Sequence, residues 1–403
     1  MIKISFGGDV KEFAAEGKSY IELISSVDPK LLNSYVAVKE GENVIDLRDV
    51  PADGACVELV GIESKEALHV LRHTATHIMA EAVKHLFPEA KLTIGPATET
   101  GFFYDFECPP FTKENLEAIE KEMKKIIKSS PRIERQVVTR DEAIAMMKAK
   151  NEPYKLELID AIPGDERITI YSQDDFADLC MGPHLLNTRL IKGFKLLSTS
   201  TAYWRGDKNN ASLARIYGTA FFTKEDCEAY LAHLEHIKNI DHNKIGREME
   251  LFTTVDVIGQ GLPLLMPKGA KIIQTLQRWI EDLEDNEWGY IRTKTPLMAK
   301  SDLYKISGHW DHYKDGMFVL GNEEKDKEVF ALRPMTCPFQ YYVYKATHHS
   351  YRDLPLRYSE TSTLFRNEDS GEMHGLTRVR QFTISEGHLI VRPDQMVEEF
   401  KKC

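Results

Sequence analysis

The stretch ESKEALHVLRHTATHIMAEAVKHLFP, residues 63–88, has the pattern of one long helix. Ser64 is a residue type that caps helices, and Pro88 is one that ends them. Apolar residues recur at helical spacing and form one stripe, which consists of Leu68, Leu71, Ala75, Ile78, Ala82 and Leu86. At about 100° per residue His73 and His77 fall on the opposite flank, so we expect them outside the core. His69 fits the same row, and the helix alone leaves open whether these histidines form half of a site or a solvated face.

The segment CMGPH, about a hundred residues later, supplies the other half of such a site. Cys180 and His184 are four residues apart and follow Asp178. Together with His73 and His77 they make a ligand set of the right softness for Zn²⁺. The same groups could instead position a water without metal, with Asp178 or a neutral imidazole as the base. The sequence therefore predicts one site, and both chemistries stay open.

Length and composition indicate a soluble chain of several domains. Its 403 residues are too many for one compact core, and about two to four domains are expected. The N-terminus MIKISFGGDV lacks the pattern of a signal peptide, and no apolar run approaches the roughly 18 residues that span a bilayer. Six scattered cysteines without CxxC spacing suit a reducing cytosol, so we expect a cytoplasmic protein. The net charge of −11 argues against general polyanion binding, but it does not exclude a local basic groove.

Residues 1–62 have the pattern of a small α+β unit. Short β-like runs (MIKISF, SYVAVKE and ACVELVG) alternate with one helical stretch, YIELISSV. From this pattern alone, a structural appendage is favoured over a dedicated binding module.

Several strings resemble a known family over the whole chain. HTATHIMAEAV, GFFYDF, DLCMGPH and YWRGDKNNASLARIYGTAF are similar to the editing domain of threonyl-tRNA synthetases, which is shared with alanyl-tRNA synthetase editing modules. GYIRTKTPLM resembles motif 1 of class II synthetases, and FRNEDSGEMHGLTRVRQF resembles motif 2, which is expected to consist of two antiparallel strands and their loop. The order of these strings is the order of the family.

The resemblance implies an α+β, multidomain architecture in four parts. Residues 1–62 are expected to form a small, β-grasp-like TGS domain, and residues 63–224 an α+β editing domain. Residues 225–248 are expected to form a linker helix. Residues 249–403 are expected to form the first part of an antiparallel-sheet class II catalytic domain.

The resemblance also implies an ATP and adenylate site in motif 2. Arg366 corresponds to the arginine that neutralises the α-phosphate during attack by the amino acid. Glu368 corresponds to a residue on the adenine side, and Arg378 to a loop arginine for ATP. Phe382 corresponds to the stacking platform for adenine. The alternative is that the two arginines are ordinary surface charges.

A zinc site for the amino acid is implied next to it. Cys337 and His388 match two ligands of one Zn²⁺ per catalytic domain, whose third ligand would lie beyond residue 403. In the family this ion binds the amino and hydroxyl groups of threonine. The alternative for Cys337 is that it is a buried free cysteine without a metal. Met335 and Glu386 are expected in the amino-acid pocket. The string ISEGH, residues 384–388, stands where the family has QDDAH. Ile384 cannot replace the amide of the family's glutamine. Glu386 can still accept a hydrogen bond from a threonine hydroxyl.

For the editing half, the resemblance implies hydrolysis of mischarged seryl-tRNA(Thr). His73, His77, Cys180 and His184 would position the water, with Asp178 beside them. Lys155, in EPYK, is expected to meet the 3′-terminal phosphate of the tRNA or the substrate. Serine would fit, and the extra methyl group of threonine would clash.

The implied function is ATP-dependent activation of threonine and its transfer to tRNA(Thr), with Mg²⁺ accompanying the ATP. A helix over roughly 269–288 leads to a strand closed by Pro296, and in this class that element forms a homodimer interface. No membrane partner is expected. The alternatives are a trans-acting editing hydrolase and a non-catalytic tRNA-binding paralogue.

The chain stops at Cys403, before any motif 3 or anticodon-binding domain. We therefore expect a fragment of a longer protein that hydrolyses seryl-tRNA but has negligible threonine-dependent ATP–pyrophosphate exchange.

Overall fold

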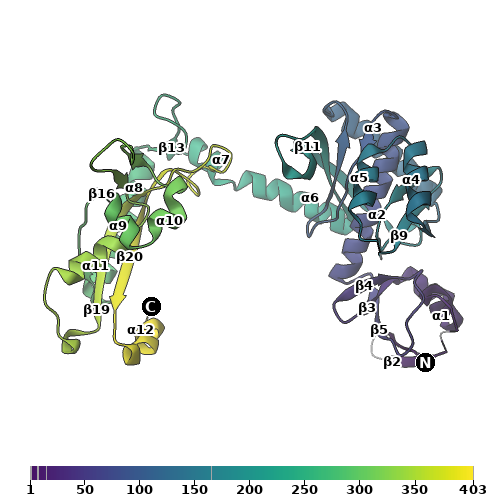
Figure 1. The fold of residues 1–403 in the computed structure, drawn as a ribbon, viewed down its shortest axis with the longest axis horizontal. Helices are drawn as coiled ribbons and strands as arrows, with labels where there is room; N and C mark the ends of the chain where they lie inside the picture. Colours follow the sequence, from purple (N-terminus) through teal and green to yellow (C-terminus); the bar gives the residue numbers. More distant parts are fainter. Residues whose placement is uncertain (1, 7–8, 15, 165, 403) are drawn as a thin grey trace. The chain divides into compact units, whose positions relative to one another are not determined.

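The computed structural model describes residues 2–6, 9–14, 16–164 and 166–402 (Figure 1). The chain divides into two compact units, Met1–Leu234 and Glu235–Cys403. Each unit is described by itself. Within the described residues, no helix combines the length and the hydropathy of a segment that crosses a bilayer.

The first unit begins with a five-stranded sheet of order β2-β1-β5-β3-β4, in which β1 and β5 are parallel. Its strands are β1 Ile2–Phe6, β2 Asp9–Phe13, β3 Tyr35–Glu40, β4 Asn43–Asp46 and β5 Cys56–Gly61, and its helix is α1 Tyr20–Val27. The predicted strands in MIKISF, SYVAVKE and ACVELVG and the predicted helix YIELISSV are confirmed. The strand β2 was not predicted, because its sequence DVKEF is polar and largely exposed.

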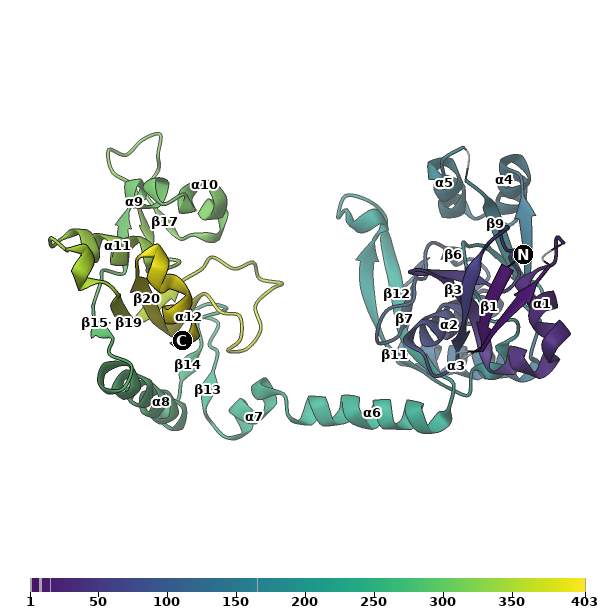
Figure 2. The ribbon, with the colours of Figure 1, turned by 90° about the horizontal axis from the view of Figure 1, so that it is seen from below.

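The long helix α2 spans Lys65–Leu86, as the opening stretch predicts. The Ser64 hydroxyl accepts a hydrogen bond from the backbone N–H of Ala67 at 3.1 Å, so Ser64 is the N-cap. Four members of the predicted stripe are fully buried: Leu71, Ala75, Ile78 and Ala82. They pack against an antiparallel sheet of order β11-β12-β7-β6 and against α3 (Lys113–Ser129); Figure 2 shows α2 beside β7 and β12. The strands are β6 Lys91–Leu92, β7 Phe102–Glu107, β11 Gly193–Tyr203 and β12 Ser212–Phe221.

The prediction that His73 and His77 both lie outside the core is wrong for His77, which is 4% exposed. His73 is partly buried. The prediction treated α2 as a surface helix with one buried face. In the structure a second layer covers the other flank, and it contains β10 and the loop that follows it. Both flanks of α2 are therefore internal over this stretch.

That second layer is a three-stranded antiparallel sheet of order β10-β9-β8 with two helices. Its core joins Ile168 and Ile170 of β9 to apolar side chains of α4 and α5. The elements are β8 Glu134–Val138, α4 Arg140–Ala149, α5 Pro153–Ala161, β9 Ile168–Gln173 and β10 Phe176–Leu179.

The predicted linker helix consists of two helices, α6 Lys224–Asn239 and α7 His242–Glu248. The break follows from Asp241, whose carboxylate accepts hydrogen bonds from the backbone N–H groups of Asn243 (2.8 Å) and Lys244 (3.3 Å). An aspartate that bonds these amides starts a new helix.

The second unit is centred on a long hairpin, β19 Leu356–Phe365 and β20 Gln381–Ile390, which confirms the two antiparallel strands expected for motif 2. The helix α8 (Pro267–Asn286) precedes β15 (Ile291–Arg292), as predicted, and β15 pairs in parallel with β19. A second small sheet has the order β16-β18-β17. The remaining elements are β13 Phe252–Thr253, β14 Leu264–Leu265, β16 Met298–Lys300, α9 Ser301–Ile306, α10 His309–Tyr313, β17 Val319–Leu320, β18 Phe330–Leu332, α11 Cys337–Lys345 and α12 Met396–Lys402.

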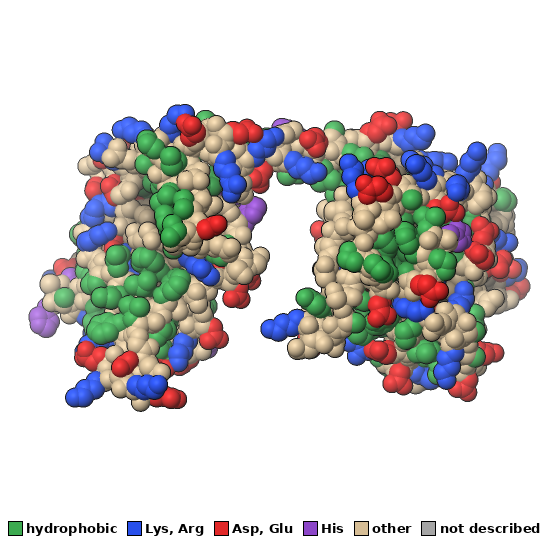
Figure 3. Space-filling model, turned by 90° about the horizontal axis from the view of Figure 1, so that it is seen from above, with side chains coloured by type: hydrophobic (Ala, Val, Ile, Leu, Met, Phe, Trp, Pro, Cys, Tyr) green, Lys and Arg blue, Asp and Glu red, His purple; other side chains and the backbone are tan. Residues whose placement is uncertain are grey.

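The second unit also has a fully buried ion pair and an exposed apolar surface. Arg333 and Glu360 form an ion pair of 3.0 Å in which both side chains are fully buried. Figure 3 shows hydrophobic side chains gathered on one face of the unit. Exposed apolar residues also follow one another at helical spacing on α8, namely Ile272, Ile273, Leu276 and Trp279.

Candidate functional site

Four side chains that are far apart in the sequence converge in the first unit. His73 and His77 project from α2, and Cys180 and His184 from the loop after β10. The Cys180 Sγ lies 3.3 Å from His73 Nε2 and 3.1 Å from His184 Nε2. The His184 ring centroid lies 4.2 Å from the ring centroids of both His73 and His77. One ligand atom of each residue therefore falls within 4.8 Å of the other three.

Burial decides the protonation of two of these imidazoles. Desolvation lowers the pKa of His73 to about 4, and burial followed by the neighbouring imidazoles holds the pKa of His184 well below its usual range. Both rings are therefore neutral near pH 7. A neutral imidazole can take a proton from water or bind a metal, so the donor set fits both chemistries that the sequence left open.

A buried ion pair lies beside the cluster. Lys155 Nζ lies 2.7 Å from Asp178 Oδ1, and the Tyr104 hydroxyl donates to Asp178 Oδ2 at 2.7 Å. Burial alone would raise the pKa of Asp178, but Lys155 and His77 outweigh it and the pKa is lowered. Asp178 is therefore ionised. Lys155 is 3% exposed and bound to Asp178, so the structure does not place its amine at the surface, where a phosphate would meet it.

The loop that holds His184 needs a glycine. Gly182 has φ +75, which L side chains rarely adopt, and a Cβ there would lie 2.1 Å from the Tyr171 hydroxyl. The backbone N–H of Gly182 donates to Cys180 Sγ at 3.4 Å. The turn thus brings the thiol and the imidazole of CMGPH to the same side.

Sequence reasoning missed two contributors from the N-terminal sheet. Asp46, the last residue of β4, accepts a hydrogen bond from the backbone N–H of His184 at 3.1 Å. Arg48 donates to the carbonyl oxygen of His184 at 3.1 Å. No sequence signal could have identified them, because each contact joins residues more than 130 positions apart.

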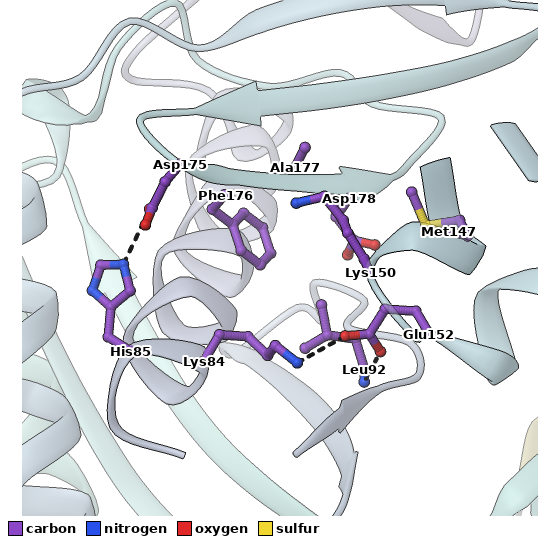
Figure 4. Close-up of a pocket in the computed structure, with 10 residues that line it drawn as sticks. All are labelled: Lys84, His85, Leu92, Met147, Lys150, Glu152, Asp175, Phe176, Ala177 and Asp178. Carbon is purple, nitrogen blue, oxygen red and sulfur yellow. Dashed lines mark hydrogen bonds and ion pairs between the residues drawn. The ribbon is translucent and has the colours of Figure 1, made fainter. Parts of the chain in front are cut away.

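A cleft of about 200 Å³ is lined by Asp178 and by residues of α2, β10 and the segment around Glu152 (Figure 4). Lys84 and Glu152 on its wall form an ion pair of 2.9 Å, and His85 pairs with Asp175 at 3.2 Å. Of the residues that line it, sequence reasoning identified only Asp178.

In the second unit, the motif 2 residues lie around the hairpin of β19 and β20. The Arg366 guanidinium carbon lies 5.1 Å from the Phe382 ring centroid. Arg366, Glu368 and Met335 line a cavity of about 390 Å³. Arg378 lines a different pocket and forms ion pairs with Glu368 (2.8 Å) and Glu372 (2.5 Å). The structure thus brings three of the predicted residues to one cavity and places Phe382 against one of them.

Cys337, Glu386 and His388 also come together, with one ligand atom of each within 4.8 Å of the others. The Ser362 hydroxyl donates to Glu386 Oε1 at 2.7 Å, and Thr336 bonds Oε2. His388 Nδ1 is buried, and it has no hydrogen-bond partner among the residues that the structure describes. Burial lowers the pKa of His388, and burial followed by Glu386 raises that of the Cys337 thiol. The His388 imidazole, whose buried Nδ1 lacks a hydrogen-bond partner within the described part of the chain, makes with the thiol and the carboxylate a set of donors that fits a zinc ion.

Ile384, where the sequence departs from the family, lies on the same side of β20 as Glu386 and His388. Ile384, Glu386 and His388 alternate along β20 and so point to one face of the sheet. Ile384 is 37% exposed there.

Comparisons with known proteins match both units. The family described as "Threonyl and Alanyl tRNA synthetase second additional domain" matches residues 168–217, and the "tRNA synthetase class II core domain (G, H, P, S and T)" matches residues 318–403. A threonine–tRNA ligase of Clostridium perfringens strain 13 is 57% identical over 404 residues, and one of Staphylococcus aureus strain JH9 is 47% identical over 403 residues. Each alignment covers 100% of this chain and 62% of the relative.

The chain therefore spans 62% of the length of these curated relatives. A solved structure titled as the RNA binding domain of threonyl-tRNA synthetase from Cryptosporidium parvum Iowa II is 35% identical, covers 40% of each chain and has a TM-score of 0.38.

Proposed function

We propose that the chain is a member of the threonine–tRNA ligase family and serves ATP-dependent ligation of threonine to tRNA(Thr) with hydrolytic editing of seryl-tRNA(Thr). The observation that carries the editing half is the convergence of His73, His77, Cys180 and His184 beside an ionised Asp178. Two of the four, and Asp178, lie in the stretch that matches the editing-domain family.

The arrangement suits ester hydrolysis. Hydrolysis needs a water held against the carbonyl carbon and a group that accepts its proton. His73 and His184 are unprotonated near pH 7 because they are buried, so both rings are in the form that accepts a proton. Asp178 supplies a fixed negative charge that stabilises an imidazolium once it forms, and Lys155 keeps Asp178 ionised. We assign the thiol of Cys180 to holding the two rings, because it contacts both.

The proposal is tested by deacylation of seryl-tRNA(Thr). Replacing His73 and His77 together by alanine should slow hydrolysis by about 10²–10⁴-fold, because general base catalysis contributes that much. The matched control is His69→Ala, since His69 is exposed on the same helix and outside the cluster. Equal deacylation by the double variant and the unmodified chain would remove the assignment.

The activation half is proposed for the cavity at the end of β19. Arg366 would neutralise the α-phosphate of an ATP that carries Mg²⁺, and Glu368 would face the adenine. Phe382 would stack the base on the ring face opposite Arg366. Arg378 must leave its two carboxylate partners before it can bind phosphate. Calorimetric titration of Arg366→Ala with ATP tests this assignment, and an affinity equal to that of the unmodified chain would contradict it.

A zinc ion is proposed at Cys337, Glu386 and His388. When bound, it would supply a Lewis acid for the amino and hydroxyl groups of threonine. Glu386 is already held by two hydroxyl groups, so the chain presets its carboxylate toward Cys337 and His388. Metal analysis should show about one zinc fewer per chain in Cys337→Ser, and no change in the control Cys56→Ser, whose thiol is exposed. Full zinc retention by Cys337→Ser would contradict the site.

A homodimer is proposed through α8. The side chains of Ile272, Leu276 and Trp279 are 47%, 54% and 59% exposed, and an apolar helix face of this kind is covered in stable assemblies. Sedimentation should show a dimer that dissociates in Leu276→Lys; a monomeric unmodified chain would contradict the proposal.

A further inference from the structure

The N-terminal sheet contacts the candidate hydrolytic site through one buried carboxylate. Asp46 is 3% exposed. Its Oδ2 accepts hydrogen bonds from the backbone N–H of His184 at 3.1 Å and from the Tyr171 hydroxyl at 3.0 Å. Its Oδ1 accepts from the backbone N–H and from a guanidinium nitrogen of Arg48, at 2.8 and 3.0 Å. Both carboxylate oxygens are therefore committed.

Arg48 completes the contact from the donor side. Its guanidinium donates to the carbonyl oxygens of Ile133 at 2.6 Å, Leu185 at 2.8 Å and His184 at 3.1 Å. Asp46 and Arg48 together thus bind both the N–H and the C=O of His184. A residue whose two peptide groups are both held in this way has little freedom to move its Cα.

The position of that Cα decides the geometry of the imidazole cluster. The His184 ring packs at 4.2 Å against two other imidazoles, and its Nε2 lies 3.1 Å from the Cys180 thiol. Its Nδ1 lies 3.3 Å from the Thr74 hydroxyl. A displacement of about 1 Å at a reacting group can cost about 10²-fold in rate.

The same N-terminal segment has a second attachment that does not touch this loop. The Asp49 carboxylate pairs with Arg135 at 3.0 Å and with Arg167 at 2.7 Å, on β8 and just before β9. Docking of the segment and positioning of His184 therefore use different carboxylates three residues apart, although Tyr171 hydrogen-bonds both Arg135 and Asp46. Asp49→Asn removes the two ion pairs and leaves the hydrogen bonds of Asp46 and Arg48 to His184 in place.

We propose that Asp46 and Arg48 are positioning residues for hydrolysis, so that the N-terminal sheet is a functional part of the hydrolytic site. The inference rests on the proposed editing function. It assigns to residues 1–62 a role that their sequence pattern does not indicate. Neither residue contacts the reacting atoms; both act through the backbone of His184.

The test compares Asp46→Asn with Asp49→Asn in seryl-tRNA(Thr) deacylation and in thermal unfolding. Asp46→Asn should lower kcat by about 10- to 100-fold and leave KM unchanged, because the substrate still binds while one imidazole is misplaced. Asp46→Asn and Asp49→Asn should lower the unfolding temperature by similar amounts, since Asp49→Asn removes two ion pairs. Only Asp49→Asn should keep the kcat of the unmodified chain. Arg48→Lys retains the charge but loses the fork that reaches three carbonyls, so it should lower kcat in the same direction.

The outcomes separate the possible failures. Equal losses of kcat in Asp46→Asn and Asp49→Asn would show that only docking matters and would overturn the inference. Unchanged kcat in Arg48→Lys and Asp46→Asn would also overturn it. Should Asp46→Asn fail to fold, Arg48→Lys decides alone. Absence of deacylation by the unmodified chain would overturn the proposed function, and the positioning role with it.

Discussion

The two candidate sites of this chain are built in opposite ways. In the first unit, His184 and Asp178 are 1% and 2% exposed, and the partners of each are fixed inside the fold. In the second unit, the Arg378 side chain is 48% exposed, and its partners are two carboxylates that a ligand must replace. One site has two imidazoles kept neutral by burial and a carboxylate kept ionised by a buried lysine, whereas the other has charges held in exchangeable pairs.

This difference indicates which steps each site has to perform. A hydrolytic site that handles water benefits from neutral imidazoles fixed in advance, because no reorganisation is then needed. A nucleotide site has to admit and release a polyanion, and exposed ion pairs are weak enough to open. If burial is the property that separates the hydrolytic site from the nucleotide site, substitutions in the two sites should differ in their effect on stability.

The largest effect is expected from breaking the buried pair of the first site. Lys155→Met should lower the free energy of unfolding by about 3–5 kcal/mol at pH 7, because it leaves Asp178 as an uncompensated buried charge. Lys125→Met is the control, since its pair with Glu122 is mostly exposed at the lysine. Urea unfolding of both variants checks this. Similar losses in the two variants would mean that burial does not strengthen the pair.

The pH dependence of stability is the next effect. Burial lowers the pKa of His73 from 6.5 to about 4, so the unfolded state binds more protons between these values. Stability from this group is complete above pH 6.5 and is lost as the pH falls toward 4, by about 3 kcal/mol in total. Urea unfolding at a series of pH values, with EDTA present, measures the slope. His73→Gln should flatten it, and an unchanged slope in that variant would contradict the assignment.

The smallest effect on stability is expected at Arg378. Arg378→Ala should leave the unfolding midpoint unchanged, because the ion pairs are exposed, while it lowers the affinity for ATP about tenfold. Arg352→Ala, which removes another exposed arginine of the same unit, should change neither property. Calorimetric titration with ATP and thermal unfolding check this. A marked fall of the midpoint in Arg378→Ala would remove the contrast between the sites.

Local patterns in the sequence predicted the elements that local physics controls. The cap at Ser64 and the extent of α2 follow from capping and apolar spacing, whereas the two strands of the motif 2 hairpin were expected from the resemblance to the family. The convergence of CMGPH with the histidines of α2 was predicted from donor chemistry alone.

The features that could not be predicted from the sequence depend on contacts between residues and on the layers that cover them. His77 is buried because a second layer covers α2, and a helical pattern records only the first apolar face. Asp46 and Arg48 bind the peptide groups of His184, and a backbone contact places no requirement on the side chain it meets. The break between α6 and α7 depends on a capping bond of Asp241 inside a stretch of helix-forming residues.

We propose above that the buried cluster of the first unit is a hydrolytic site, and such a site has to select serine. This proposal is tested most directly by the rates at which this chain hydrolyses preformed seryl-tRNA(Thr) and threonyl-tRNA(Thr) under single-turnover conditions. We predict that the serine ester is hydrolysed faster by about 10- to 200-fold, because one methyl group separates the two substrates. Equal rates, or faster hydrolysis of the threonine ester, would contradict the account.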